Sequence, residues 1–460
     1  MKKKEIMVMV PYPAQGHVSP MQKLGWEFVR QGFEAVIVIP KFIHRQIAEL
    51  QKNDENEMIK WVALPDHEEE EGSNPPEDFF AIESAMENSS ITTHLEALLH
   101  SLAAEGGHVA CLVVDLLASW AIQVSDRLAI PCAGFWPAMF ATYLFISAIP
   151  HFLQTRLISN SGLPQHEGKF SLEPELPVIS TEDLPWLVGT DAARKARFKF
   201  WKRTLERSSA LKWLLVNSFP DESKLELANN KKFTACRRVL PIGPICNCRN
   251  DELRKSVSFW EEDMSCLKWL EKQKAKSVVY ISFGSWVSPI GEAKLKNLAL
   301  ALEASGRPFI WVLRSTWRHG LPLGFMERVV KQGRGMMVSW APQNQILQHN
   351  SVACYITHCG WNSILEALQF QKKLLCYPVA GDQSVNCAYV VQVWRVGLKL
   401  NGLEPKDVEE GLVRVIQDKE MDTRLRILNQ RIMGTNNKTG ALMLKTFLQD
   451  LKKASSTATT

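Results

Sequence analysis

The sequence has little net charge and few cysteines for its length. Its 460 residues carry 54 basic and 49 acidic side chains, a formal net charge of +5. An excess this small, without a dense basic stripe, argues against nucleic acid or an acidic membrane surface as a partner. Ten cysteines are too sparse for a disulfide scaffold, so we expect reduced thiols in a cytoplasmic protein.

Metal-binding motifs are also missing. No two Cys-x-x-Cys pairs stand at zinc spacing, and no His-Glu-x-x-His sequence occurs. The pair Cys246 and Cys248 forms a lone Cys-x-Cys in a loop-like stretch, which is a weak metal signal. The sequence therefore predicts neither a metal site nor a bound cofactor.

One uncharged stretch, residues 128–155, is long enough to span a membrane. Pro131, Pro137 and Pro150 interrupt it, which fits a buried strand, a loop and a buried helix better than a membrane helix. The apolar run at residues 6–10 is too short for a signal peptide. We therefore expect no stable membrane anchor.

Apolar runs alternate with helical patterns over most of the chain. Buried apolar runs separated by helices indicate parallel sheets covered on both faces. Residues 156–200 show no clear period and suggest a long surface excursion. The predicted strands are residues 6–10, 35–39, 58–64, 109–114, 130–135, 278–283, 309–313, 352–357 and 374–379.

The length, at roughly 150 residues per domain, and a change of composition near residue 240 indicate more than one domain. Prolines, glycines and charged residues at 237–256 suit an extended linker. We expect an N-terminal domain at 1–240, a linker at 241–256 and a C-terminal domain at 257–435.

Ligands of open parallel sheets bind beyond the carboxyl ends of the strands. His17 follows the first strand, where it could act as a general base or be an exposed loop histidine. Asp115 ends a Val-rich strand, where it could orient an imidazole or cap the next helix. The strand-end polar residues are His17, Asp115, Ser285, His358 and Asp382.

The segment from Trp340 to Gln383 is the richest in such residues. A glycine-containing turn at His358–Ser363 presents backbone N–H groups and a helix dipole to an anion. Ser363 and Glu366 also fit a capping box. Trp340 could stack on a flat base or fill the core, and Asp382-Gln383 could bind sugar hydroxyls or simply begin a helix.

This segment closely resembles the signature box of plant secondary-product UDP-glycosyltransferases. Pro13–Met21 and Ile281–Ser285 are similar to that family's acceptor loop and phosphate-side loop. The residues that match the box are Trp340, Ala341, Pro342, Gln343, Thr357, His358, Cys359, Gly360, Trp361, Asn362, Ser363, Glu366, Asp382 and Gln383.

The resemblance implies an α/β GT-B fold, with two Rossmann-like parallel-sheet domains facing across a cleft. The acceptor would bind the N-terminal domain and the UDP-sugar the C-terminal one, and residues 436–460 would return to the N-terminal domain. It further implies a metal-independent, inverting transfer. His17 would be the base, and Asp115 would stand behind it.

For the donor, the resemblance implies that Trp340 stacks on uracil while Ala341 and Gln343 bond its edge, and that Glu366 holds the ribose. Gln383 and Trp361 favour UDP-glucose. The diphosphate would contact Ser285, His358, Asn362 and Ser363, and the sugar would contact Trp361, Asp382 and Gln383.

The acceptor is expected to be a small apolar molecule with a hydroxyl or carboxyl group. Its aromatic wall is assigned to Phe135, Trp136, Phe140 and Tyr143, with ordinary core packing as the alternative. No residue pattern identifies the acceptor itself. We expect a monomer.

The chain departs from the family pattern at Gln371-Lys372-Lys373, where Gly-Val-Pro is usual, and at Ala353, where Gly is usual. We expect an altered loop there rather than lost binding. Two other functions stay open. A non-catalytic UDP-sugar-binding regulator would not need the His17–Asp115 pair, and a nucleotide-sugar epimerase would turn over its substrate without an acceptor.

Overall fold

The structure, a computed structural model, describes residues 4–50, 59–65, 82–83, 89–219, 222, 238–245, 256–285 and 290–457. The Cys246–Cys248 pair and most of the expected linker lie outside these residues. Two compact units divide the chain. Unit 1 is Met1–Ala148, Lys199–Trp260 and Asn436–Thr460, and unit 2 is Ile149–Phe198 and Glu261–Thr435.

Unit 1 is built on a parallel sheet. Among the described residues it has seven strands in the order β3-β2-β1-β4-β5-β8-β9. Its central strands are apolar throughout because helices cover both faces. The strand order reverses between β1 and β4, a topological switch point. The strands are β1 (Lys4–Val10), β2 (Glu34–Pro40), β3 (Ile59–Leu64), β4 (Gly107–Asp115), β5 (Cys132–Trp136), β8 (Trp213–Val216) and β9 (Arg238–Pro241).

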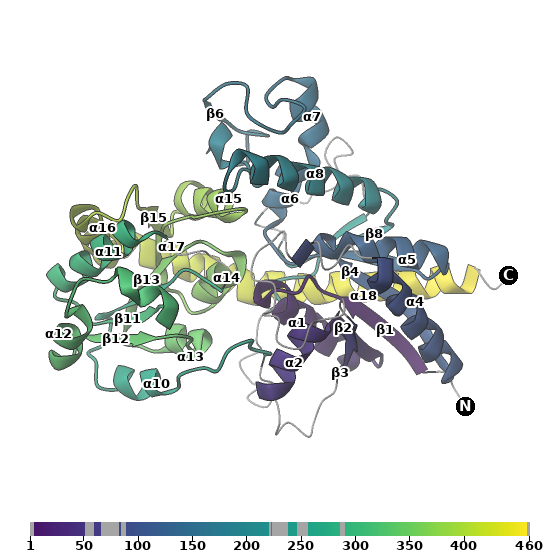
Figure 1. The fold of residues 1–460 in the computed structure, drawn as a ribbon, viewed down its shortest axis with the longest axis horizontal. Coiled ribbons are helices and arrows are strands. Elements are labelled where there is room, and N and C mark those ends of the chain that lie inside the picture. The colour runs from purple at the N-terminus through teal and green to yellow at the C-terminus, as the bar shows by residue number, and fades with distance from the viewer. Residues whose placement is uncertain are drawn as a thin grey trace. The chain divides into compact units, whose positions relative to one another are not determined.

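Two helices from opposite ends of the sequence pack together on this sheet. Phe28 of α1 and Phe447 of α18 lie 6.4 Å apart between ring centroids, and α18, yellow in Figure 1, contacts β4 and β9. The helices of the unit are α1 (Gln15–Arg30), α2 (Lys41–Leu50), α4 (Ser89–Ala104), a 3-10 helix (Leu116–Ala121), α5 (Ile122–Arg127), α6 (Phe140–Ser147) and α18 (Asn437–Thr457).

A buried carboxyl group holds the start of α6. Oε2 and Oε1 of Glu222 accept hydrogen bonds from the backbone N–H groups of Phe140 and Ala141, each at 2.9 Å, and Ser218 donates its hydroxyl. Burial raises the pKa of Glu222 from 4.5 to about 7. The folded protein therefore keeps this proton at a pH where the unfolded chain has lost it.

The stability that Glu222 contributes should consequently fall as the pH rises from about 4.5 through about 7. A Glu222→Gln variant does not titrate. We expect the difference in unfolding free energy, wild type minus variant, to shrink by about 3 kcal/mol between pH 5 and pH 8. Urea unfolding at several pH values measures it, with exposed Glu271→Gln as the control. A constant difference would contradict the assignment.

Unit 2 contains a second parallel sheet. Within the described residues its six strands have the order β12-β11-β10-β13-β14-β15, so the switch point lies between β10 and β13. The strands are β10 (Val278–Ser282), β11 (Phe309–Val312), β12 (Gly335–Val338), β13 (Val352–Thr357), β14 (Lys373–Cys376) and β15 (Gly397–Lys399), and a small sheet pairs β6 (Lys169–Phe170) with β7 (Ile179–Ser180).

The helices of unit 2 connect these strands. Two of them, Tyr389–Val393 and Arg431–Asn436, are π-helical turns. The others are α7 (Ile149–Gln154), α10 (Ser265–Leu270), α11 (Glu292–Ala304), α12 (Phe325–Lys331), α13 (Gln343–Gln348), α14 (Trp361–Gln369), α15 (Gln383–Ala388), α16 (Pro405–Gln417) and α17 (Lys419–Gln430), with 3-10 turns at Thr181–Asp183 and Ser315–Gly320.

The expectation of a surface excursion at 156–200 is wrong. The segment contains the start of α8 (Asp191–Ser208) and a buried core, in which the fully buried Trp186 donates to the carbonyl of Gly162 at 2.7 Å. The pattern of α8 is hidden because its arginines and lysines are interspersed with its apolar residues.

Residues 149–198 also cluster with unit 2, so the compact units differ from the expected division at residue 240. Val178 exchanges two backbone hydrogen bonds with the Gln392 amide, at 3.0 and 2.9 Å. Ser384 donates to Asp183 at 3.0 Å. These contacts join the segment to the second half of the chain.

The unusual Gln371-Lys372-Lys373 segment is fully partnered in unit 2. Gln371 adopts a left-handed conformation with φ of 55°, which explains why glycine is usual there. The ammonium group of Lys373, nearly buried, donates to the carbonyls of Ile416 and Asp418 at 3.0 and 2.8 Å. A cation at the last carbonyls of α16 is stabilised by the helix dipole.

A Lys373→Met variant should therefore lose stability rather than activity. It removes the charge from the end of α16 and breaks the ion pair with Asp422, which lies 3.0 Å from the ammonium. We expect a loss of about 1–3 kcal/mol in unfolding free energy, measured by urea unfolding. Exposed Lys406→Met is the control, and equal losses in the two variants would refute the cap.

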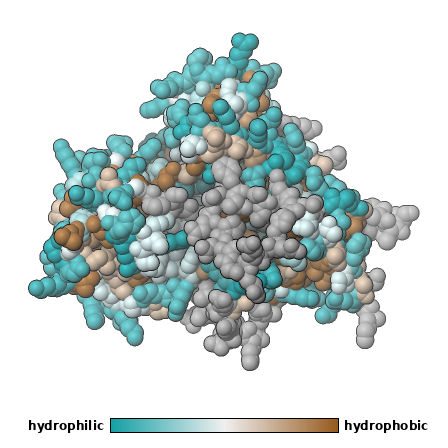
Figure 2. All heavy atoms as spheres, viewed as in Figure 1, coloured by the Kyte–Doolittle hydropathy of each residue, from teal (hydrophilic) through white to brown (hydrophobic). Residues whose placement is uncertain are grey.

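Hydrophilic residues cover most of the described surface in the view of Figure 2, with hydrophobic ones scattered among them. Among the described residues, no helix has the length and apolar character that crossing a membrane requires. The uncharged stretch at 128–155 forms β5, α6 and α7, as expected of a buried strand followed by buried helices.

Candidate catalytic and donor sites

The predicted catalytic pair lies at the switch point of unit 1. His17 sits in the first turn of α1, which follows β1, rather than in a loop as expected, because the helix begins at Gln15. Asp115 is the last residue of β4. The strand order makes β1 and β4 neighbours, and His17 Nδ1 lies 2.7 Å from Asp115 Oδ2.

The carboxyl group of Asp115 makes two contacts. Its Oδ1 accepts from the backbone N–H of Leu117 at 2.9 Å and caps the 3-10 helix, while its Oδ2 faces His17. The carboxyl group is fully buried, so it needs these donors. The His17 side chain is 20% exposed. Because Nδ1 faces the carboxylate, Nε2 is the ring nitrogen that does not contact Asp115 in this pair.

The switch point of unit 2 holds the predicted phosphate residues, Ser285 after β10 and His358 after β13. Two glycines make room for the His358 ring. A Cβ atom on Gly284 would lie 2.5 Å from His358 Nε2, and one on Gly360 would lie 2.4 Å away. The His358 imidazole, just after β13, thus packs closely against the backbone of two glycines.

Burial lowers the pKa of His358 to about 4, so the ring is neutral at pH 7. Within the described part of the chain, its buried Nδ1 has no hydrogen-bond partner. A buried nitrogen without a partner is costly, and a bound group, an ordered water or a catalytic role can account for it. A neutral imidazole can supply that group with one N–H donor.

The capping box, the alternative interpretation of Ser363 and Glu366, is not formed. Gly360 is the N-cap of α14 and makes no side-chain cap, which places Ser363 inside the helix. Oε2 of Glu366 instead accepts from Nε2 of Gln343 at 2.6 Å. Glu366 therefore does not cap α14.

Gln343 organises this part of unit 2 through its side chain. Its Oε1 accepts from the hydroxyls of Tyr280 and Tyr355 at 3.1 and 3.0 Å. Its Nε2 donates to Ser363 at 3.2 Å as well as to Glu366. The amide thus joins two strands to α14 through hydrogen bonds.

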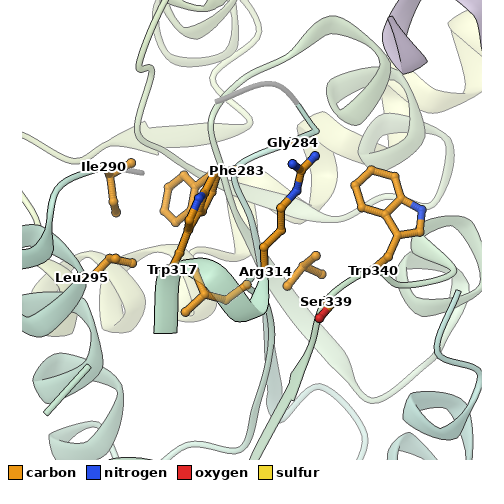
Figure 3. A pocket seen from close by; sticks show the side chains of 10 residues that line it. Phe283, Gly284, Ile290, Leu295, Arg314, Trp317, Ser339 and Trp340 are labelled. Carbon is orange, nitrogen blue, oxygen red and sulfur yellow. The ribbon is translucent and has the colours of Figure 1, made fainter. Parts of the chain in front are cut away.

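Trp340 lines a pocket at the carboxyl ends of β10, β11 and β12 (Figure 3). The Arg314 side chain extends between Trp317 and Trp340, and its Nη2 donates to the carbonyl of Ser285 at 2.7 Å. The lining residues are Phe283, Gly284, Ile290, Leu295, Val312, Leu313, Arg314, Trp317, Ser339 and Trp340.

Arg314 and Trp317 were missed from the sequence. Arg314 comes just after the predicted strand at 309–313, so the strand-end rule would have found it had it been applied to that strand. Trp317 follows in a 3-10 turn, with the Arg314 guanidinium carbon 5.8 Å from its ring centroid. Only spatial proximity singles it out.

Most of the remaining box residues follow the ends of β13 and β14. Gln383 Oε1 accepts from the backbone N–H groups of Val379 and Ala380 at 2.9 and 3.0 Å, and Asp382 accepts from Asn386 at 2.7 Å. These bonds fix the turn before α15. Ala341, Pro342, Cys359 and Trp361 are buried, and Asn362 is half-buried.

The four aromatic residues assigned to the acceptor wall are interior residues of unit 1. Phe135 belongs to the hydrophobic core, the alternative weighed for it. The other three form a cluster, with Phe140 stacked on Tyr143 at 5.8 Å and Trp136 at 5.7 Å from Tyr143 between centroids. Phe140 and Tyr143 of this cluster lie in α6, whose first two backbone N–H groups donate to Glu222.

The fold and these sites define a UDP-glycosyltransferase with the GT-B fold. A family model described as UDP-glucoronosyl and UDP-glucosyl transferase matches residues 8–430, and the chain belongs to this family. UDP-glycosyltransferase 82A1 of Arabidopsis thaliana is 49% identical over 96% of this chain and 98% of its own length.

More distant relatives and solved structures agree. The (R)-mandelonitrile beta-glucosyltransferase of Prunus dulcis is 28% identical over 92% of this chain and 91% of its own length. The structure of Medicago truncatula UGT71G1 complexed with UDP-glucose has a TM-score of 0.80 at 22% identity, covering 98% of each chain. The family and the GT-B fold predicted from the signature box are thus confirmed.

Proposed function

We propose that this chain transfers glucose from UDP-glucose to a hydroxyl or carboxyl group of a small apolar acceptor, with inversion at the anomeric carbon and without a metal ion. The observation that carries the proposal is the 2.7 Å contact between His17 and Asp115 at a sheet switch point, in a chain of the UDP-glycosyltransferase family.

His17 acts as the general base. Asp115 fixes the tautomer with hydrogen on Nδ1, so Nε2 carries the lone pair that takes the proton of the acceptor. The deprotonated oxygen attacks the anomeric carbon from the face opposite UDP. The imidazolium that forms is stabilised by the buried carboxylate, which is why both residues are needed.

UDP occupies the switch point of unit 2. The uracil stacks on Trp340, and Glu366, oriented by Gln343, accepts from the ribose hydroxyls. The diphosphate meets Ser285, His358 and the first N–H groups of α14, together with the side chains of Asn362 and Ser363. These donors stabilise the charge that grows on the leaving group as the glycosidic bond breaks.

The sugar meets Trp361, Asp382 and Gln383. Glucose as the sugar is supported by the names of relatives, such as the Prunus dulcis beta-glucosyltransferase. Trp361 and Gln383, which favour UDP-glucose by the family resemblance, support it as well. The acceptor wall is assigned to Trp136, Phe140 and Tyr143. Mandelonitrile, named for that relative, is a small hydroxyl compound of the expected kind.

Mass spectrometry of products tests the proposal directly. The enzyme is incubated with UDP-glucose and a panel of small plant hydroxyl and carboxyl compounds, and products heavier by one hexose are expected, with β-linkages by NMR. EDTA should leave the rate unchanged. Tight UDP binding without product on a broad panel would favour the regulator, and UDP-glucose turnover without acceptor would favour the epimerase.

A further inference from the structure

Three cysteine side chains meet inside unit 2. Cys359 follows His358 in the turn before α14, Cys376 ends β14, and Cys387 lies in α15. Their Sγ atoms all lie within 4.8 Å of one another. In the described part of the chain, no other three His, Cys, Asp or Glu side chains come this close together. The transfer mechanism uses none of these sulfur atoms.

The three thiols are buried and are not joined by a disulfide bond. Their residues are 0%, 0% and 2% exposed.

We propose that Cys359, Cys376 and Cys387 form a binding site for a soft cation, and specifically for Cu⁺. Sulfur ligands select Cu⁺ and Zn²⁺ over hard ions such as Mg²⁺ and Ca²⁺. Structural zinc sites are almost always four-coordinate. Here only three ligand atoms converge, in a buried place, and three sulfur ligands suit Cu⁺.

Binding is an exchange of protons for a metal ion. Each Cu–S bond uses a sulfur lone pair, the thiol protons that are displaced pass to the solvent, and copper stays in its +1 state. Metal–thiolate bonds are about 2.3 Å long. Binding one ion would therefore draw the three sulfur atoms closer together than 4.8 Å, the distance within which they all lie at present.

Two of the segments that would move, the turn before α14 and α15, also carry donor residues. Cys359 lies between His358 and Gly360, and Cys387 lies four positions after Gln383. On the proposed function, Cu⁺ should therefore raise the KM for UDP-glucose. The metal binding itself does not depend on that function, because its ligands are defined by sulfur geometry alone.

Competition with a chromogenic Cu⁺ chelator, bathocuproine disulfonate, tests the site under anaerobic, reducing conditions. The full chain is used with Cys246→Ser and Cys248→Ser, which removes the Cys-x-Cys pair. We expect it to retain one equivalent of Cu⁺. Further Cys376→Ser or Cys387→Ser substitutions should weaken the affinity at least tenfold, while Cys354→Ser, a buried cysteine of β13, should not.

Mapping of protected thiols keeps the proposal testable if a variant fails to fold. The Cu⁺-loaded protein is alkylated with iodoacetamide during unfolding and digested for mass spectrometry. Copper should slow alkylation of Cys359, Cys376 and Cys387 but not of Cys354. Retention of less than half an equivalent, equal protection of all cysteines, or a disulfide within the cluster in place of bound copper would overturn the proposal.

Discussion

Replacing His17 with alanine is expected to lower kcat for glucosyl transfer by about 10²–10⁴-fold, the usual contribution of a positioned general base. The acceptor proton then has no base, while the donor residues of unit 2 are untouched. The Kd for UDP, measured by calorimetry, should stay within about twofold of wild type. UDP release with the acceptor found by product screening gives kcat.

His108→Ala is the matched control, because His108 is an exposed histidine of β4 in the same unit. It should leave both kcat and the Kd for UDP unchanged. Near-normal turnover by the His17→Ala enzyme would remove the mechanism. A parallel loss of UDP binding would show instead that the substitution damages the fold, which thermal unfolding would reveal.

The second large effect is expected from Asp115→Asn. The asparagine carbonyl can keep the bond from Leu117 N–H, but its amide N–H₂ then faces His17 Nδ1. That nitrogen must become an acceptor, which puts the hydrogen on Nε2 and leaves it unable to take a proton. We expect kcat to fall by about 10²–10⁴-fold with little loss of stability.

Two measurements separate this tautomer effect from simple damage. The double variant His17→Ala, Asp115→Asn should be no slower than His17→Ala alone, because the carboxylate acts only through the imidazole. Urea unfolding of Asp115→Asn should stay within about 1 kcal/mol of wild type, since the helix cap survives. Multiplied losses of activity in the double variant would argue against a shared role.

Much of the fold could be predicted from the sequence because parallel strands are short apolar runs. The run at 352–357 matches β13 at both ends, and the His17–Asp115 contact follows from strand ends at a switch point. The periodic signal fails where surface charge dominates, as in α8. The periodic pattern also does not fix the residue at which a helix starts. A difference of one turn therefore decides whether His17 is predicted in a loop or in α1.

Contacts made by side chains distant in sequence could not be predicted. Nothing in the local pattern shows that Gln343 binds two tyrosines from different strands, or that Lys373 reaches the end of α16. The cysteine cluster is of the same kind, since its members come from three elements and no spacing rule joins them. Such contacts are set by register and packing, which one sequence does not display.

The placement of α18 has a consequence for synthesis on the ribosome. The ring centroids of Phe447 and Trp213 lie 5.5 Å apart, and Phe447 is fully buried. Part of the core of unit 1, whose first strands are translated early, is therefore supplied by α18. A nascent chain holds β1 to β9 long before residue 447 emerges. Until α18 is made, the faces of β4 and β9 that it contacts lack this packing, so the amino-terminal strands cannot reach their final stability before residue 447 is available.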